Sequence, residues 1–116
     1  MSKSHPESNQ EKVVVDLNNP EFLDSWFSLR DKNERARVLN TIEKLTRLTW
    51  AQVYQDAGLK WERITHSPVS LPSGVDVVYS IRVTQARRAV VFRQQQFMRF
   101  LLIAEDHDST YPKRKK

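Results

Sequence analysis

Apolar and polar residues follow two different periods along this chain, and the change of period falls near residue 59. Before this point, apolar residues recur every three or four positions, as on one face of an α-helix. After it they alternate in short runs, as in β-strands. This segregation predicts an α+β domain, with a helix hairpin packed on one face of a mainly antiparallel sheet. The other sheet face is expected to be open and wet.

Helix start signals are clear in the first half. Residues 19–21 supply an Asn cap, a proline at the first helical position and an acid in the first turn, and this helix is expected to run to about Leu29. A second helix is expected from Asp31, because Asp31 and Glu34 have the spacing of a capping box. The two would form an antiparallel hairpin, with core contacts expected from the apolar register at Trp26, Leu39, Ile42 and Leu45.

A short third helix is expected from Thr49, with Gln52 completing a capping pattern and Gly58 ending the helix. The segment 66–76 contains two prolines and a Ser-Gly pair and is expected to be a loop. Strands are expected at 12–17, 60–64, 77–84, 88–93 and 97–104.

With 116 residues, the chain is long enough for one domain, expected at 12–111 between a disordered tail (1–11) and a basic tail (112–116). It contains no cysteine, and its three histidines form no local ligand pair, so neither a metal nor a cofactor is expected. The start of the chain lacks the apolar stretch of a signal peptide, and the apolar run 100–104 is too short to span a bilayer. A cytoplasmic protein without membrane contact is the resulting expectation.

The net charge of +5 is unevenly distributed. Between residues 77 and 104 the chain has no acid and five arginines, and a guanidinium can donate two hydrogen bonds to one phosphate. A polyanion-binding surface is therefore favoured over the alternative of solvated edge strands. Arg82 and Arg88 lie within apolar strand patterns, where a salt bridge to an acid such as Glu62 is the alternative. Arg99 is open to the same structural interpretation.

The end of the chain offers groups for proton transfer. His107 and Tyr111 lie four residues apart, just beyond the last expected strand. Histidine exchanges protons near neutral pH, and tyrosine can donate a proton or stack on a base. Beside arginines, such a pair could assist attack of a ribose 2′-hydroxyl on the neighbouring phosphate. The alternative is a pair of surface residues near a chain end.

Five segments together resemble the RelE/ParE toxin superfamily, in their order and spacing, over roughly residues 12–111. They are Leu59-Lys60-Trp61-Glu62-Arg63-Ile64, Val78-Tyr79-Ser80-Ile81-Arg82-Val83, Arg87-Arg88-Ala89-Val90-Val91-Phe92, Met98-Arg99-Phe100-Leu101-Leu102-Ile103 and His107-Asp108-Ser109-Thr110-Tyr111. Ser80 departs from the family pattern, since a second basic residue often occupies this position. The loop 66–76 is also longer than usual.

The resemblance implies a curved antiparallel sheet, a cognate antitoxin as protein partner, and metal-independent mRNA cleavage at the ribosome. The site residues that it implies are catalytic His107, Tyr111, Arg82 and Arg88, with Lys60 assisting. Arg87, Arg93 and Arg99 complete the expected RNA- and phosphate-binding set.

Three functions remain open at this point. The first is a ribosome-dependent mRNA endonuclease of a type II toxin–antitoxin system, which inhibits translation. The second is an inhibitor of DNA gyrase like the ParE members of the same superfamily, which would have no need of His107 and Tyr111. The third is a non-catalytic, basic nucleic-acid-binding module, against which the lack of an RRM-type aromatic motif argues.

Overall fold

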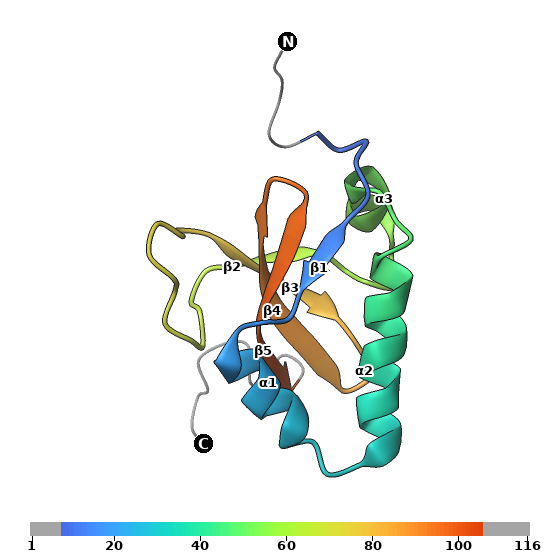
Figure 1. Cartoon of the computed structure of the whole chain (residues 1–116), viewed down its shortest axis with the longest axis vertical. Helices are drawn as coiled ribbons and strands as arrows, with labels where there is room; N and C mark the ends of the chain where they lie inside the picture. The colour runs from blue at the N-terminus through green and yellow to red at the C-terminus, as the bar shows by residue number, and fades with distance from the viewer. Residues whose placement is uncertain (1–7, 106–116) are drawn as a thin grey trace.

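The computed structural model describes residues 8–105, which form an α+β fold with one five-stranded sheet (Figure 1). The class expected from the sequence is thus confirmed. None of the helices in this part of the chain is long and apolar enough to cross a membrane. The elements in chain order are β1 (Val14–Asp16), α1 (Pro20–Phe27), α2 (Lys32–Leu45), α3 (Trp50–Gln55), β2 (Glu62–Ile64), β3 (Val78–Arg82), β4 (Arg87–Gln94) and β5 (Phe97–Glu105).

The sheet has the strand order β1-β5-β4-β3-β2. β2, β3, β4 and β5 pair antiparallel in succession, whereas β1 pairs in parallel with β5. The sheet is therefore mainly antiparallel, as expected, with one parallel edge. A register shift between Val90 and Val91 interrupts the pairing of β4 with β5, and such a bulge bends the strands locally.

The main core lies between the helices and one face of the sheet. On α2, Val38, Ile42 and Leu45 follow each other at helical spacing and are at most 8% exposed. Leu39 was expected in this core, and that prediction is wrong, because its side chain is 46% exposed. One residue advances a helix by about 100°, so a stripe through Val38 turns its neighbour Leu39 towards solvent.

Helix α1 packs mainly on β5. The rings of Phe22 and Phe100 meet edge to face at 5.3 Å. Beyond the short β1, the edge of β5 is covered by α1, and Ser25 Oγ accepts a hydrogen bond from the backbone N–H of Ile103 at 2.9 Å. A backbone N–H at this edge of the sheet thereby has a hydrogen-bond partner. α1 and α2 meet at Trp26, whose indole donates to the Arg35 carbonyl at 3.4 Å.

The helix ends agree only partly with their sequence signals. Asn19 caps α1, and the Thr49–Gln52 capping box of α3 is formed. Asp31 caps α2 by accepting from the Asn33 backbone N–H, but the carboxylate of Glu34 bonds elsewhere, so the capping box predicted there is absent. α3 ends at Gln55, three residues before Gly58, because the Asp56 side chain accepts from the Leu59 N–H and turns the chain.

The second face of the sheet was predicted to be open, but in the structure it is covered. The 65–77 segment crosses it and packs Val69, Leu71 and Val75 against a second apolar cluster. Pro72 and Gly74 shape the turn of this segment, where Gly74 has a φ of 82°. The sheet residues of this cluster are Ile64, Val78, Val90, Phe92 and Leu101.

Asp56 is expected to make the stability of the fold depend on pH. Lys44 Nζ lies 2.9 Å from Asp56 Oδ2, and the hydrogen bond from Lys44 lowers the pKa of Asp56 below its usual 3.8 despite partial burial. Because the folded pKa is below the unfolded one, the carboxylate stabilises the fold above about pH 4 and this contribution is lost as pH falls further. Asp56→Asn should therefore lower the free energy of unfolding at pH 7, with the difference from the parent shrinking towards pH 2 in urea titrations. Asp76→Asn, at an exposed loop position, is the control, and an equal deficit of Asp56→Asn at both pH values would contradict the linkage.

Candidate nucleic-acid interface

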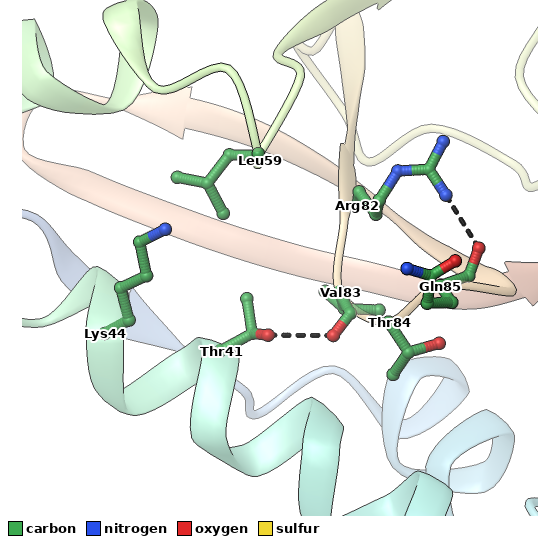
Figure 2. A pocket seen from close by; sticks show the side chains of 8 residues that line it. Thr41, Lys44, Leu59, Arg82, Val83, Thr84 and Gln85 are labelled. Atoms are coloured by element: carbon green, nitrogen blue, oxygen red, sulfur yellow. Dashed lines mark hydrogen bonds between the residues drawn. The ribbon is translucent and has the colours of Figure 1, made fainter.

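Basic and polar side chains gather where β3 ends and β4 begins. The chain turns from Val83 to Arg87 through backbone bonds, and Thr84 Oγ1 accepts from the Ala86 N–H at 3.2 Å. Arg82 lies on one side of this turn, where its guanidinium donates to the Gln85 carbonyl at 2.7 Å. Thr41 of α2 ties the turn to the helices by donating to the Val83 carbonyl at 2.8 Å (Figure 2).

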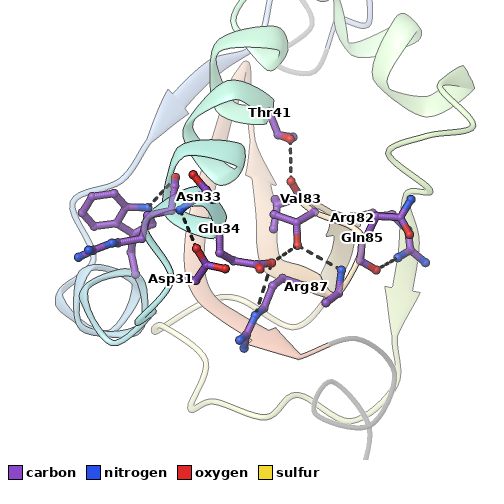
Figure 3. Close-up of polar contacts among 12 residues, drawn as sticks. Asp31, Asn33, Glu34, Thr41, Arg82, Val83, Gln85 and Arg87 are labelled. Carbon is purple, nitrogen blue, oxygen red and sulfur yellow. Dashed lines mark hydrogen bonds and ion pairs between the residues drawn. The ribbon is translucent and has the colours of Figure 1, made fainter.

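Arg87 and Glu34 lie on the other side of the turn. Arg87 Nε is 3.8 Å from Glu34 Oε2, and the same oxygen accepts from Thr84 Oγ1 at 2.5 Å (Figure 3). The carboxylate is mostly buried, with 14% of its side chain exposed, whereas Arg87 retains 28%. Glu34 thus anchors the turn to α2 and holds the Arg87 side chain against the body of the protein.

Two shallow clefts flank this anchored turn. One, of about 320 Å³, lies between α2 and the start of the turn, and the other, of about 550 Å³, lies between the end of α1 and Arg87. Both present cations beside hydroxyl groups, a combination that suits phosphate oxygens. The first is lined by Thr41, Lys44, Gly58, Leu59, Arg82, Val83, Thr84 and Gln85, and the second by Ser25, Ser28, Leu29, Arg30, Asp31, Arg87 and Ile103.

We expected Arg82 and Arg88 to lie on the same open surface as His107, and for Arg88 this prediction is wrong. The two are cross-strand partners and so share a sheet face, but the Arg88 side chain has no solvent exposure. Its guanidinium donates to Ser80 Oγ at 2.7 and 2.9 Å and to the Lys60 carbonyl at 2.8 Å, and it lies 3.5 Å from Glu62. The salt bridge to Glu62, weighed as the alternative from the sequence, is therefore present. Ser80, a small residue that is itself fully buried, accepts two of these hydrogen bonds through its hydroxyl.

Ser80→Ala should destabilise the fold by about 1–3 kcal/mol, because a buried guanidinium would lose a hydroxyl acceptor that receives two of its bonds. The free energy of unfolding in urea measures this effect. Ser73→Ala, at an exposed position in the 65–77 loop, should change it by no more than about 0.5 kcal/mol. Equal stabilities of the two variants would show that the Ser80–Arg88 bonds contribute nothing.

Two of the other predicted phosphate ligands, Arg93 and Arg99, lie towards the ends of β4 and β5 that are opposite the turn. Lys60 lies nearer the turn, because the carbonyl of the neighbouring Leu59 accepts a hydrogen bond from the Arg82 N–H at 2.7 Å. Arg93 bonds to Tyr54, Asn9 and the Ser8 carbonyl, and Arg99 forms an ion pair with Asp16, which is the structural role anticipated for it. Lys60 is exposed, with its backbone in the left-handed region at φ 53°. The five arginines therefore do not form one continuous surface, and only Arg82 and Arg87 flank the clefts.

His107 and Tyr111 lie outside the described residues. The structure nevertheless defines where the chain reaches the end of β5, because Glu105 pairs with Arg87 and Ala104 pairs with Arg88. Within residues 8–105, no group of three histidine, aspartate or glutamate side chains is arranged to hold a metal ion.

The sequence analysis missed one cluster of rings. Trp50, Tyr54, Trp61 and Tyr79 contact each other in succession at centroid distances between 4.5 and 5.7 Å. The high density of aromatic residues between positions 50 and 61 was a usable signal, but the contact with Tyr79 depends on the β2–β3 register.

Fold and site together define an α+β protein with an open, mainly antiparallel sheet and a basic turn at one end. No family model matches the sequence, and no curated protein matches it. Among solved structures, the chain is similar to the YoeB dimer from Staphylococcus aureus, with a TM-score of 0.43 and 12% identity over 88% of this chain and 99% of that one. A similarity of this size assigns the chain to no family.

Proposed function

We propose that this chain is the toxin of a bacterial type II toxin–antitoxin system and cleaves mRNA without a metal ion. The observation that carries the proposal is the strand register at the basic turn. Arg82, Arg88 and Ala104 are successive partners across three strands, and Glu105 pairs with Arg87. The segment with His107 and Tyr111 thus continues from the strand end beside the turn.

Arg82 and Arg87 are the proposed phosphate ligands. Adjacent strands lie about 4.8 Å apart, so the row from Arg82 to Ala104 spans about 10 Å. Contacts to Gln85 and Glu34 hold the two guanidinium groups in place before RNA arrives. Preorganised cations stabilise the charge that develops on the phosphorus oxygens in the transition state.

His107 and Tyr111 are the proposed proton-transfer groups. One accepts the proton of the ribose 2′-hydroxyl as its oxygen bonds to phosphorus, and the other protonates the 5′-oxygen as the P–O bond breaks. The products are a 2′,3′-cyclic phosphate and a free 5′-hydroxyl, and the reaction consumes no other reactant.

Arg88 enters the proposal as a positioning residue. Buried bonds to Ser80 and the Lys60 carbonyl connect β4 through β3 to the start of β2. Lys60 itself is exposed at this junction and could assist in RNA binding. In the same proposal, Arg93 and Arg99 are phosphate contacts away from the turn, a cognate antitoxin is the protein partner, and the ribosome presents the mRNA in the cytoplasm.

Induced expression in a bacterium, with separate measurements of mRNA integrity and DNA supercoiling, tests this function. Translation arrest with cut mRNA is the expected result, and Arg82→Ala should relieve it while Arg37→Ala, an exposed arginine on α2, should not. DNA damage with intact mRNA would instead establish inhibition of gyrase, and the absence of both effects would contradict toxicity.

A further inference from the structure

We propose that the aromatic cluster formed by Tyr54, Trp61 and Tyr79 is a second binding site, on which bases of single-stranded nucleic acid stack. It lies near the β2 edge of the sheet and beside α3, and it shares β3 with the basic turn, because Tyr79 and Arg82 belong to the same strand. The proposal does not require the chain to cut RNA.

The rings of this cluster are held in a fixed arrangement. Trp61 stacks on Tyr79 at a centroid distance of 4.5 Å and an interplanar angle of 22°, and Tyr54 meets Trp61 edge to face at 5.4 Å. Arg93 donates to the Tyr54 hydroxyl at 2.9 Å while lying 4.3 Å from the Trp50 ring. Because these contacts immobilise the rings beforehand, a stacked base would cost them little conformational entropy.

Trp61 and Tyr79 pack against the main core, and the rings of the cluster differ in exposure. Trp50 is fully buried and donates to the Gln96 carbonyl, so it serves as the support. Tyr54 is 40% exposed, and Trp61 and Tyr79 are both partly exposed. Partly exposed aromatic rings placed next to each other are a feature by which proteins bind unpaired bases without sequence preference.

Charge indicates the class of ligand. Arg63 is exposed, and as the cross-strand partner of Tyr79 it lies on the same sheet face as that ring. Lys60, also exposed, directly precedes Trp61. A cation beside a stacking surface fits a phosphodiester backbone with its attached bases, and a net charge of +5 favours approach of such a polyanion.

Fluorescence anisotropy with a labelled oligothymidylate of about 12 nucleotides tests the proposal. This ligand lacks the 2′-hydroxyl, so it measures binding without the proposed cleavage reaction. Tyr54→Ala should weaken binding about tenfold, because one base loses its stacking partner. Tyr54→Phe keeps the ring and loses only the hydrogen bond from Arg93, so it should weaken binding much less. Arg63→Ala should weaken binding and reduce the salt dependence by about one phosphate contact.

Two exposed residues elsewhere provide matched controls. Phe27→Ala removes a ring that is 63% exposed on α1, and Arg37→Ala removes an exposed cation on α2. Neither should change affinity by more than about twofold, which corresponds to the usual range for neutral surface changes. A duplex of the same length should bind more weakly, because its bases are paired and stacked internally.

Photocrosslinking of the parent protein to an oligonucleotide with 5-iododeoxyuridine locates the site even if a variant fails to fold. The expected crosslinks map to Tyr54, Trp61 or Tyr79. Failure of the parent to bind the oligonucleotide, crosslinks confined to other residues, or equal losses in the cluster and control variants would each overturn the inference. If the parent protein binds oligothymidylate but does not cleave mRNA, that result contradicts the proposed function and leaves this inference intact.

Discussion

His107→Ala is expected to slow RNA cleavage by about 10²–10⁴-fold while leaving the fold and antitoxin binding intact. This is the range of effects seen when a positioned general acid or base is removed. His107 follows the end of β5 by two residues in the sequence, and that end pairs with Arg87 beside the basic turn. Cleavage of a reporter mRNA, with circular dichroism to verify folding, measures the effect.

His66→Ala is the matched control for this substitution. His66 is exposed and lies near the start of the 65–77 segment, so losing its imidazole should leave cleavage and growth arrest unchanged. A folded His107→Ala protein that cleaves as fast as the parent would remove the catalytic assignment, and the gyrase alternative would then be favoured over the nuclease.

Ile42→Asp is expected to unfold the protein. Ile42 is 8% exposed in the middle of α2 and belongs to the core between the helices and the sheet. A carboxylate at this position would be buried without a partner, which costs more than about 4 kcal/mol. Domains of this kind have a total stability of about 5–15 kcal/mol, so most or all of it would be lost. Urea denaturation followed by circular dichroism gives the free energy of unfolding.

Leu39→Asp separates burial from helix propensity, because it places the same residue in the same helix at a position that is 46% exposed. The two substitutions share the propensity cost of about 0.5 kcal/mol, and only Ile42→Asp adds a desolvation cost. Similar losses in both variants would show that α2 does not pack as the structure has it.

Local signals predicted much of the fold. The Asn19-Pro20 start of α1 and the Thr49–Gln52 capping box of α3 depend on residues within one helical turn, and both are present. The prediction of Leu39 as a core residue was wrong, because the adjacent apolar residues Val38 and Leu39 fit two neighbouring helical faces equally well. Only the sheet beneath α2 decides which face is buried.

The candidate site depended on contacts between distant residues, and there the sequence predicted less. The burial of Arg88 follows from its position opposite Ser80 and near the Lys60 carbonyl, which is a consequence of strand register. The segment 66–76 was correctly expected to be a loop. Its apolar residues at 69, 71 and 75 pack on the second sheet face, which was wrongly expected to be open. The prediction for His107 and Tyr111 concerns residues beyond those described.

The parallel pairing of β1 with β5 has a consequence for how the protein is made. Val14 pairs with Phe97 and Asp16 with Arg99, so the first described strand meets its partner only when the last one exists. Closing so long a loop slows folding, and until then the apolar faces of the nascent chain are exposed. Chains that stall in translation before Phe97 should therefore be recognised by chaperones and proteases, and any activity of this protein should arise only once β5 has been synthesised.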